Sequence, residues 1–106
     1  MVPPIRYFLV GGYLESDTSR KDIDLMGMLG EKDFELIFGY THESLQKAYR
    51  EESTEKLRKY LHANKVTGWV LSSMFGKKVD FKWIPPTMLY NPCEELYLEA
   101  DVTMYL

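Results

Sequence analysis

Hydrophobic and polar residues alternate most regularly over residues 77–84 (KKVDFKWI). Val79, Phe81 and Trp83 share one face of this segment, and two lysines and an aspartate share the other. A period of two predicts a strand with one buried face. The prolines at positions 85 and 86 end it, because proline interrupts a β-ladder.

Three further segments have β-type patterns. Residues 5–10 (IRYFLV) are rich in strand-forming residues and end at a glycine pair, which predicts a first strand and a turn. Residues 22–29 (DIDLMGML) begin with clear alternation, so we expect a second strand there. Residues 95–106 (ELYLEADVTMYL) predict one or two strands near the sheet edge.

The middle of the chain has helical periodicity. Thr41 and Ser53 are suitable N-caps, so we expect one helix over 42–51 and a second over 54–64. Residues 67–75 (TGWVLSSMF) fit a helix or a strand, and periodicity does not decide between them. These elements predict an α/β (α+β) fold with a small mixed or antiparallel sheet and helices mainly on one face.

Length and composition favour one domain over residues 1–106, because the chain has 106 residues and 45% of them are hydrophobic. A net charge of −3 argues against bulk electrostatic attachment to nucleic acid or an anionic membrane, although a local basic cluster stays open. We expect a cytoplasmic protein, because no apolar run approaches the ~20 residues of a membrane span and the start lacks a secretory signal. Cys93 is the single cysteine, which fits a reducing compartment, and we expect it to be a buried or turn residue.

Three aspartates form the candidate catalytic and metal-binding set. Asp22 and Asp24 stand two positions apart on a predicted strand, so their side chains project the same way from Cα atoms roughly 7 Å apart. Their mutual repulsion is relieved by a divalent cation, and carboxylate oxygens suit Mg²⁺ or Mn²⁺. Asp80, on the polar face of its strand, is the expected third carboxylate. Such a site holds the two ions that an in-line phosphoryl displacement uses.

A second group of residues is suited to a triphosphate. Gly11 and Gly12 allow the backbone to approach a ligand closely, and N–H groups in such a turn can bind phosphate oxygens. Cationic side chains stand beside the aspartates in the sequence and are candidate phosphate contacts. They are Arg20, Lys21, Lys78 and Lys82.

These residues carry a resemblance to a known family. Val10, Gly11 and Gly12, then nine residues, then the segment 22–25 (DIDL) resemble the signature of the polymerase-β-like nucleotidyltransferase superfamily, and 79–81 (VDF) resembles its third acidic motif. The small size is similar to that of its minimal members. The resemblance implies that Asp22 and Asp24 bind both metal ions, that Asp80 binds one and helps to activate an acceptor hydroxyl, and that the glycines hold a nucleoside triphosphate. It also implies transfer of a nucleoside monophosphate to an acceptor hydroxyl, for which a partner protein is one candidate.

Other interpretations stay open. The aspartates could be charges that protect an edge strand from aggregation, and the lysines could only solvate an exposed face. The chain could be a non-catalytic module of the same fold, such as an antitoxin-type regulator acting on a protein partner. It could also be a structural protein that forms a homodimer by pairing residues 95–106. Trp69 and Trp83 could stack on a base, but we expect both in the core.

Overall fold

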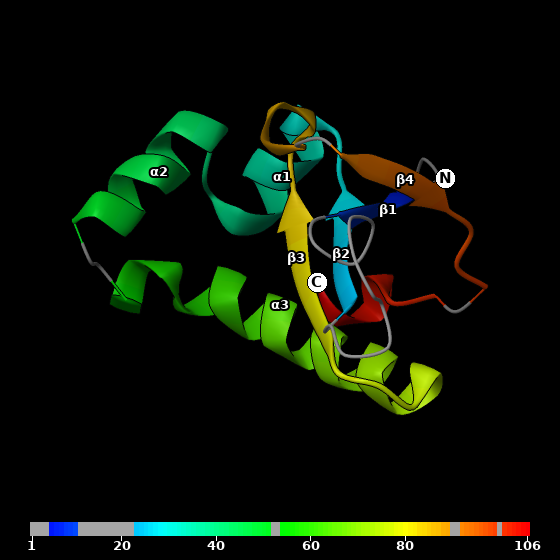
Figure 1. Ribbon diagram of the computed structural model, residues 1–106. Coiled ribbons are helices and arrows are strands. Elements are labelled where there is room, and N and C mark those ends of the chain that lie inside the picture. The colour runs from blue at the N-terminus through cyan, green and yellow to red at the C-terminus, as the bar shows by residue number, and fades with distance from the viewer. Residues whose placement is uncertain (1–4, 11–22, 52–53, 90–91, 100) are drawn as a thin grey trace.

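The computed structural model describes residues 5–10, 23–51, 54–89, 92–99 and 101–106 (Figure 1). These residues form an α+β fold with a mixed sheet, as the sequence predicted. In chain order the elements are β1 (Arg6–Val10), β2 (Ile23–Met28), α1 (Glu31–Phe38), α2 (His42–Arg50), α3 (Thr54–Phe75), β3 (Val79–Ile84), the 3-10 helix η3 (Pro86–Met88), β4 (Cys93–Leu96) and the 3-10 helix η4 (Thr103–Tyr105).

The four strands lie in the order β3-β2-β1-β4. β1 is antiparallel to both β2 and β4, whereas β2 and β3 are parallel. A parallel pair needs a long crossover connection, and α1, α2 and α3 all lie in the chain between these two strands. β3 and β4 are therefore the edge strands of the described sheet.

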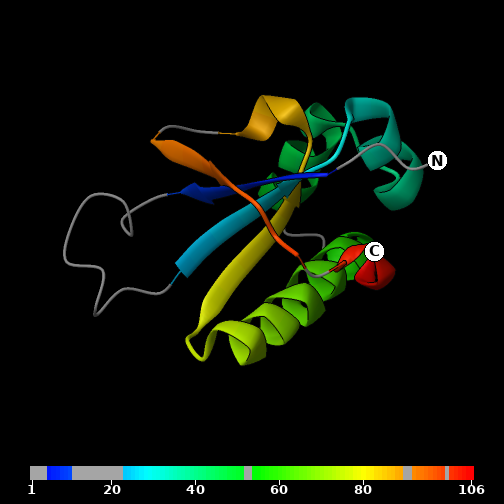
Figure 2. The same cartoon turned by 90° about the vertical axis from the view of Figure 1, so that its right-hand side faces the viewer.

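The helices cover one face of the sheet. The larger core cluster joins Tyr7, Leu25 and Trp83 of the strands to buried residues of all three α-helices. The cluster on the opposite face consists of Phe8, Val10, Met26 and Ile84, and α1–α3 contribute none of its described members. Figures 1 and 2 show α3 running alongside one face, so the predicted one-sided arrangement is confirmed.

Helix α3 includes the segment that periodicity left undecided. It runs without interruption from Thr54 to Phe75, so residues 67–75 are helical and the expected end near residue 64 is wrong. Gly68 permits this path, because a Cβ atom there would lie 3.0 Å from the carbonyl oxygen of Val79. The helix thus packs directly against the backbone of β3. Helix α1 was not predicted, and its buried Phe34 and Phe38 lie one turn apart.

The predicted strands over 95–106 are wrong beyond Leu96, where β4 ends. The chain then turns, because the Asp101 carboxylate accepts hydrogen bonds from the backbone N–H and the hydroxyl of Thr103. Asp and Asn favour such local turns over extended structure. These hydrogen bonds also lower the pKa of Asp101. The turn places Val102 in the main core.

Side chains of α3 hydrogen-bond to backbone groups of β3 at its outer edge. The backbone N–H of Trp83 donates to Asn64 Oδ1 at 2.8 Å, and that of Val79 donates to Ser72 Oγ at 2.8 Å. The Tyr60 hydroxyl donates to the Trp83 carbonyl at 2.7 Å. Burial raises the pKa of Tyr60, so the phenol stays a donor at neutral pH.

We expect Asn64→Ala to lower the free energy of unfolding by about 1–3 kcal/mol, because it leaves the buried N–H of Trp83 without an acceptor. Denaturant unfolding measures this change. Arg58→Ala, at an exposed position of the same helix, is the control and should stay within about 0.5 kcal/mol of the parent protein. Equal effects of the two substitutions would contradict this account of the edge.

An exposed ion pair joins β1 to β4. Arg6 Nε and a terminal guanidinium nitrogen donate to the two carboxylate oxygens of Glu95 at 2.7 and 3.1 Å. Hydrogen bonding to Arg6 lowers the pKa of Glu95, because it favours the ionised carboxylate. A lowered pKa means that the pair stabilises the fold above the pKa of the unfolded chain. This contribution is lost as the pH falls through the folded-state pKa.

Arg6→Gln should therefore raise the pKa of Glu95, which carboxyl chemical shifts followed by NMR during an acid titration would measure. The parent protein should also lose more stability than the variant over the same acid range. An unchanged Glu95 titration midpoint in Arg6→Gln would show that the ion pair does not persist in solution.

Candidate metal and nucleotide site

The parallel pairing of β2 and β3 places Asp24 directly opposite Asp80. Neighbouring strands lie about 4.8 Å apart, and residues in register point to the same face. Both aspartates lie on the face away from the helices, because Leu25, Val79 and Phe81 beside them belong to the helix-covered core. The structure thus brings together two of the three predicted carboxylates.

The other residues of the predicted motif lie outside the described part of the chain. They are Gly11, Gly12, Arg20, Lys21 and Asp22. Their predicted roles in triphosphate and metal binding stay predictions.

A small hollow of about 150 Å³ lies at the aspartate pair. Its lining includes Val10, Asp24 and Met26, together with Asp80 and Lys82. The side chain of Asp80 is 55% exposed, and its Oδ1 lies 4.0 Å from Nζ of Lys78. Asp24 is half-buried. Two carboxylates and Lys82 therefore line one opening, and Lys78 lies beside Asp80, which suits a ligand that carries both metal ions and phosphates.

The chemistry of these donors fits Mg²⁺ or Mn²⁺. Magnesium sites commonly use one or two carboxylates and complete the coordination with water and substrate phosphates. Asp24 and Asp80 supply two such groups. The described residues contain no cluster of three or more His, Cys, Asp or Glu side chains arranged for a metal ion. The predicted third ligand is Asp22, which lies outside them.

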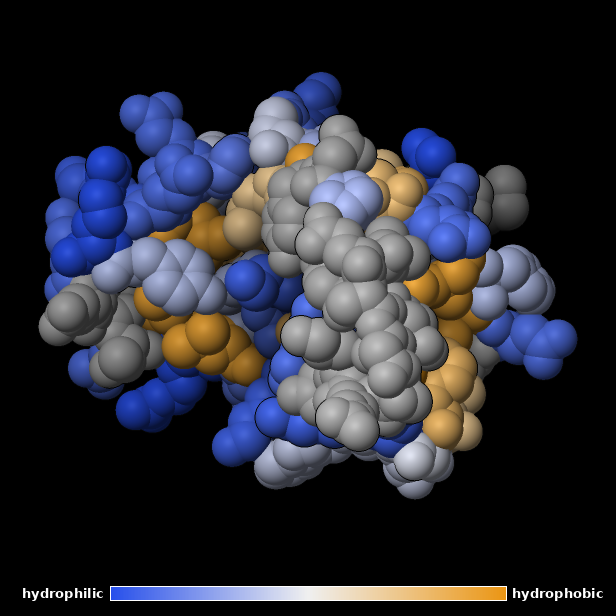
Figure 3. Space-filling view, viewed as in Figure 1, coloured by the Kyte–Doolittle hydropathy of each residue, from blue (hydrophilic) through white to orange (hydrophobic). Residues whose placement is uncertain are grey.

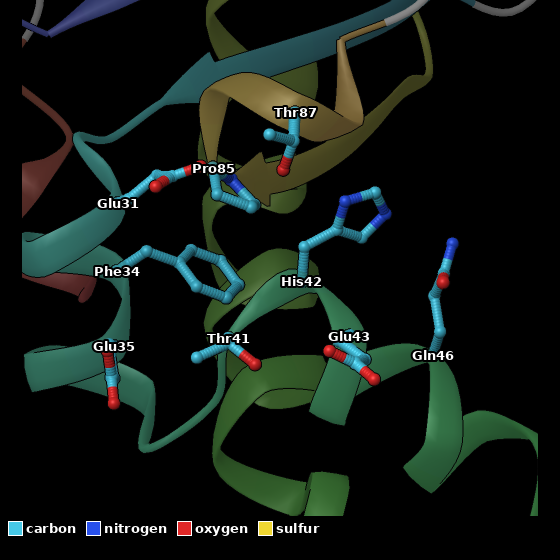
Figure 4. Close-up of a pocket in the computed structure, with 9 residues that line it drawn as sticks. All are labelled: Glu31, Phe34, Glu35, Thr41, His42, Glu43, Gln46, Pro85 and Thr87. Atoms are coloured by element: carbon cyan, nitrogen blue, oxygen red, sulfur yellow. The ribbon is translucent and has the colours of Figure 1, made fainter.

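A separate cavity of about 370 Å³ lies between α1, the start of α2 and the segment after β3 (Figure 4). Phe34 and Pro85 contribute apolar lining, and Glu31, Glu35 and Glu43 stand around it. Figure 4 shows these three glutamates spread around the cavity and not directed to a common point. The cavity thus lacks the convergent carboxylates of a metal site.

A larger groove of about 570 Å³ runs along β3 and reaches Asp80. Its lining includes Leu61, Lys65 and Trp69, and none of these belongs to the predicted site. The expectation that Trp69 lies in the core is wrong, since 63% of it is exposed, whereas Trp83 is buried as expected. A spacing of four residues between the three side chains was a usable signal, because it places them on one stripe of a helix.

Comparisons of the chain with protein-family models, with curated proteins and with solved structures gave no match. Among the described residues, no helix is both long enough and apolar enough to cross a membrane. The geometry around Asp24 and Asp80 is therefore the basis for a functional proposal.

We expect Mn²⁺ to bind at the aspartate pair and not at the cavity of Figure 4. Paramagnetic broadening of amide NMR signals would distinguish the two, because the effect is confined to the neighbourhood of the ion. Residues 23–25 and 79–81 should lose intensity first, and Asp24→Asn should suppress the loss. Preferential broadening at Glu31, Glu35 and Glu43 would place the ion elsewhere and contradict the assignment.

Proposed function

We propose that this protein is a metal-dependent nucleotidyltransferase that moves a nucleoside monophosphate from a nucleoside triphosphate to an acceptor hydroxyl. The observation that carries the proposal is the register of Asp24 opposite Asp80 on adjacent parallel strands. The motif at residues 10–12 and 22–25 and the triplet 79–81 support it, because Asp24 and Asp80 occupy positions that the family resemblance assigns to metal ligands.

In the proposed reaction, the acceptor oxygen forms a bond to the α-phosphorus of the triphosphate. The bond from that phosphorus to the oxygen bridging to the β-phosphate breaks, and pyrophosphate leaves with the electron pair. The acceptor proton passes to a carboxylate, for which Asp80 is the best placed described residue because its side chain is the more exposed of the pair. Two bound Mg²⁺ or Mn²⁺ ions would supply charge neutralisation to the triphosphate and to the leaving group.

The protein's own residues would contribute position and charge. Asp24, half-buried between strands, has a restricted position, which suits a ligand that must hold a fixed geometry. Lys78 and Lys82 flank Asp80 along the chain and can contact phosphate oxygens. Most of the rate enhancement of phosphoryl transfer comes from such positioning and electrostatic stabilisation.

The last strand bears on the alternative of a homodimer formed through this edge. If two copies of β4 paired antiparallel about its centre, Glu94 of one copy would stand opposite Glu95 of the other. Like charges directly opposite each other destabilise a strand pair. The ion pair of Glu95 with Arg6 offsets part of this repulsion, so the acidic residues disfavour this register without excluding a homodimer.

Thermal unfolding with each nucleoside triphosphate and Mg²⁺ or Mn²⁺ tests the proposal without knowledge of the acceptor. Binding to the native state adds about 2.7 kcal/mol to the free energy of unfolding at a ligand concentration 100 times Kd, and this raises the midpoint temperature. We expect a metal-dependent rise in the parent protein and none in Asp24→Asn. Once an acceptor is found, Asp24→Asn should lower the rate of pyrophosphate release by roughly 100-fold or more.

Glu94→Gln is the matched control, because it removes a carboxylate from β4 outside the hollow and should leave the nucleotide response unchanged. A rise of equal size in Asp24→Asn and in the parent protein would sink the assignment of the aspartate pair. No rise with any nucleotide would favour the non-catalytic, partner-dependent alternative.

A further inference from the structure

The groove along β3 shares Asp80, Phe81 and Lys82 with the aspartate hollow and adds aromatic and cationic side chains from the helices. We call it the β3 groove, and its exposed side chains come from α2, α3 and residues 78–82. They are Tyr49, Leu61, Lys65, Trp69, Lys78, Asp80 and Lys82. Figure 3 shows hydrophobic surface in the region between α2 and α3, bordered by hydrophilic side chains.

Two aromatic rings are available to a ligand in this groove. Trp69 is 63% exposed and Tyr49 is 44% exposed, although aromatic side chains gain most from burial. The ammonium group of Lys65 lies 5.0 Å from the centroid of the Trp69 ring. A planar group stacked on this ring would therefore lie close to a cation.

The charge of the groove is opposite to that of the whole protein. Lys65, Lys78 and Lys82 line it, and Asp80 is the one acid among its lining residues in the described part of the chain. The chain itself carries a net charge of −3. The groove is thus a local basic cluster with interleaved aromatic rings, and it suits a chain of anions that carries flat apolar groups.

We infer that the β3 groove binds single-stranded nucleic acid, with bases stacked on Trp69 and Tyr49 and phosphates paired with the three lysines. This binding needs neither metal nor nucleoside triphosphate, so it can be tested separately from the proposed reaction, although both use Lys78 and Lys82. Because the groove reaches Asp80, a strand bound in it passes beside the aspartate pair.

An extended peptide fits the groove less well. A peptide that adds to a sheet edge needs unpaired backbone groups. At β3 the N–H groups of Val79 and Trp83 already donate to Ser72 and Asn64, and the Trp83 carbonyl accepts from Tyr60. A peptide would keep the charge contacts but could not pair with these backbone groups, whereas a nucleic acid strand needs only stacking and phosphate pairing.

The tryptophans provide a direct readout. Trp83 is fully buried and Trp69 is exposed, so a base that stacks on the protein should quench the fluorescence of Trp69. We would titrate the protein with an oligothymidine of about ten nucleotides in EDTA without any nucleotide, and measure affinity by anisotropy of a labelled strand. If the oligonucleotide does not bind under these conditions, the inference about the groove fails. The thermal shift with nucleoside triphosphate is not affected by that result.

We expect Trp69→Ala to weaken binding at least about fivefold, since stacking of one base is worth about 1–3 kcal/mol. Tyr97→Ala is the matched control, because Tyr97 is exposed and lies outside the groove. The double variant Lys78→Ala/Lys82→Ala should flatten the salt dependence, since each phosphate contact to a single strand contributes about 0.7 to the slope of log K against log salt.

Several results would overturn the inference. They are equal affinity in the Trp69→Ala and Tyr97→Ala variants, no quenching of tryptophan fluorescence, or polyglutamate binding as tightly as the oligonucleotide. The last result would show that the groove recognises negative charge alone, as an acidic protein partner would require. Tighter binding of duplex DNA than of single-stranded DNA would also overturn the inference, because the bases of a duplex are not free to stack on the protein.

Discussion

The outer edge of β3 depends on α3 for its hydrogen bonds, and this dependence determines much of the structure. A strand edge left open exposes backbone groups that pair readily with other chains. Here Asn64, Ser72 and Tyr60 satisfy backbone groups of Val79 and Trp83. The hydrogen-bonding groups of α3 and β3 must lie opposite each other. This requirement fixes where β3 lies along α3 and how far the two elements are apart. Gly68 sets that distance, because a side chain there would meet the backbone of β3.

The contact between α3 and β3 also links the two candidate binding regions. With β3 held by α3 on one side and by β2 on the other, Asp80 comes opposite Asp24. The polar residues of the helix that face β3 are used for this purpose, and the neighbouring stripe of Leu61, Lys65 and Trp69 is left facing the groove. One edge of the sheet therefore carries a carboxylate pair and a basic aromatic surface next to each other. This adjacency gives the two functional proposals a common structural origin.

Local patterns predicted β1, β2 and β3 well, but they predicted β4 and the pairing of the strands poorly. The alternation over residues 77–84 places Asp80 on the polar face, because side-chain direction in a strand depends only on local geometry. That β3 is parallel to β2 is a long-range property, and no local pattern contains it.

The secondary structure of residues 67–75 was ambiguous from the sequence, since Gly68 and the β-branched residues around it are poor helix formers. In the structure these residues are helical, and Gly68 packs closely against β3. Trp69 was misassigned because its exposure depends on which face of α3 meets the sheet.

The parallel pairing of β2 and β3 also has a consequence for the order of folding. Asp24 and Asp80 are far apart in the chain, and all three α-helices lie between them. Closing so long a connection costs entropy before any contact repays it, so non-local pairings of this kind form slowly. The helices can form from local contacts first, whereas the aspartate pair exists only after β3 has docked. A partly folded chain with native helix content would therefore still lack both the carboxylate pair and the β3 groove.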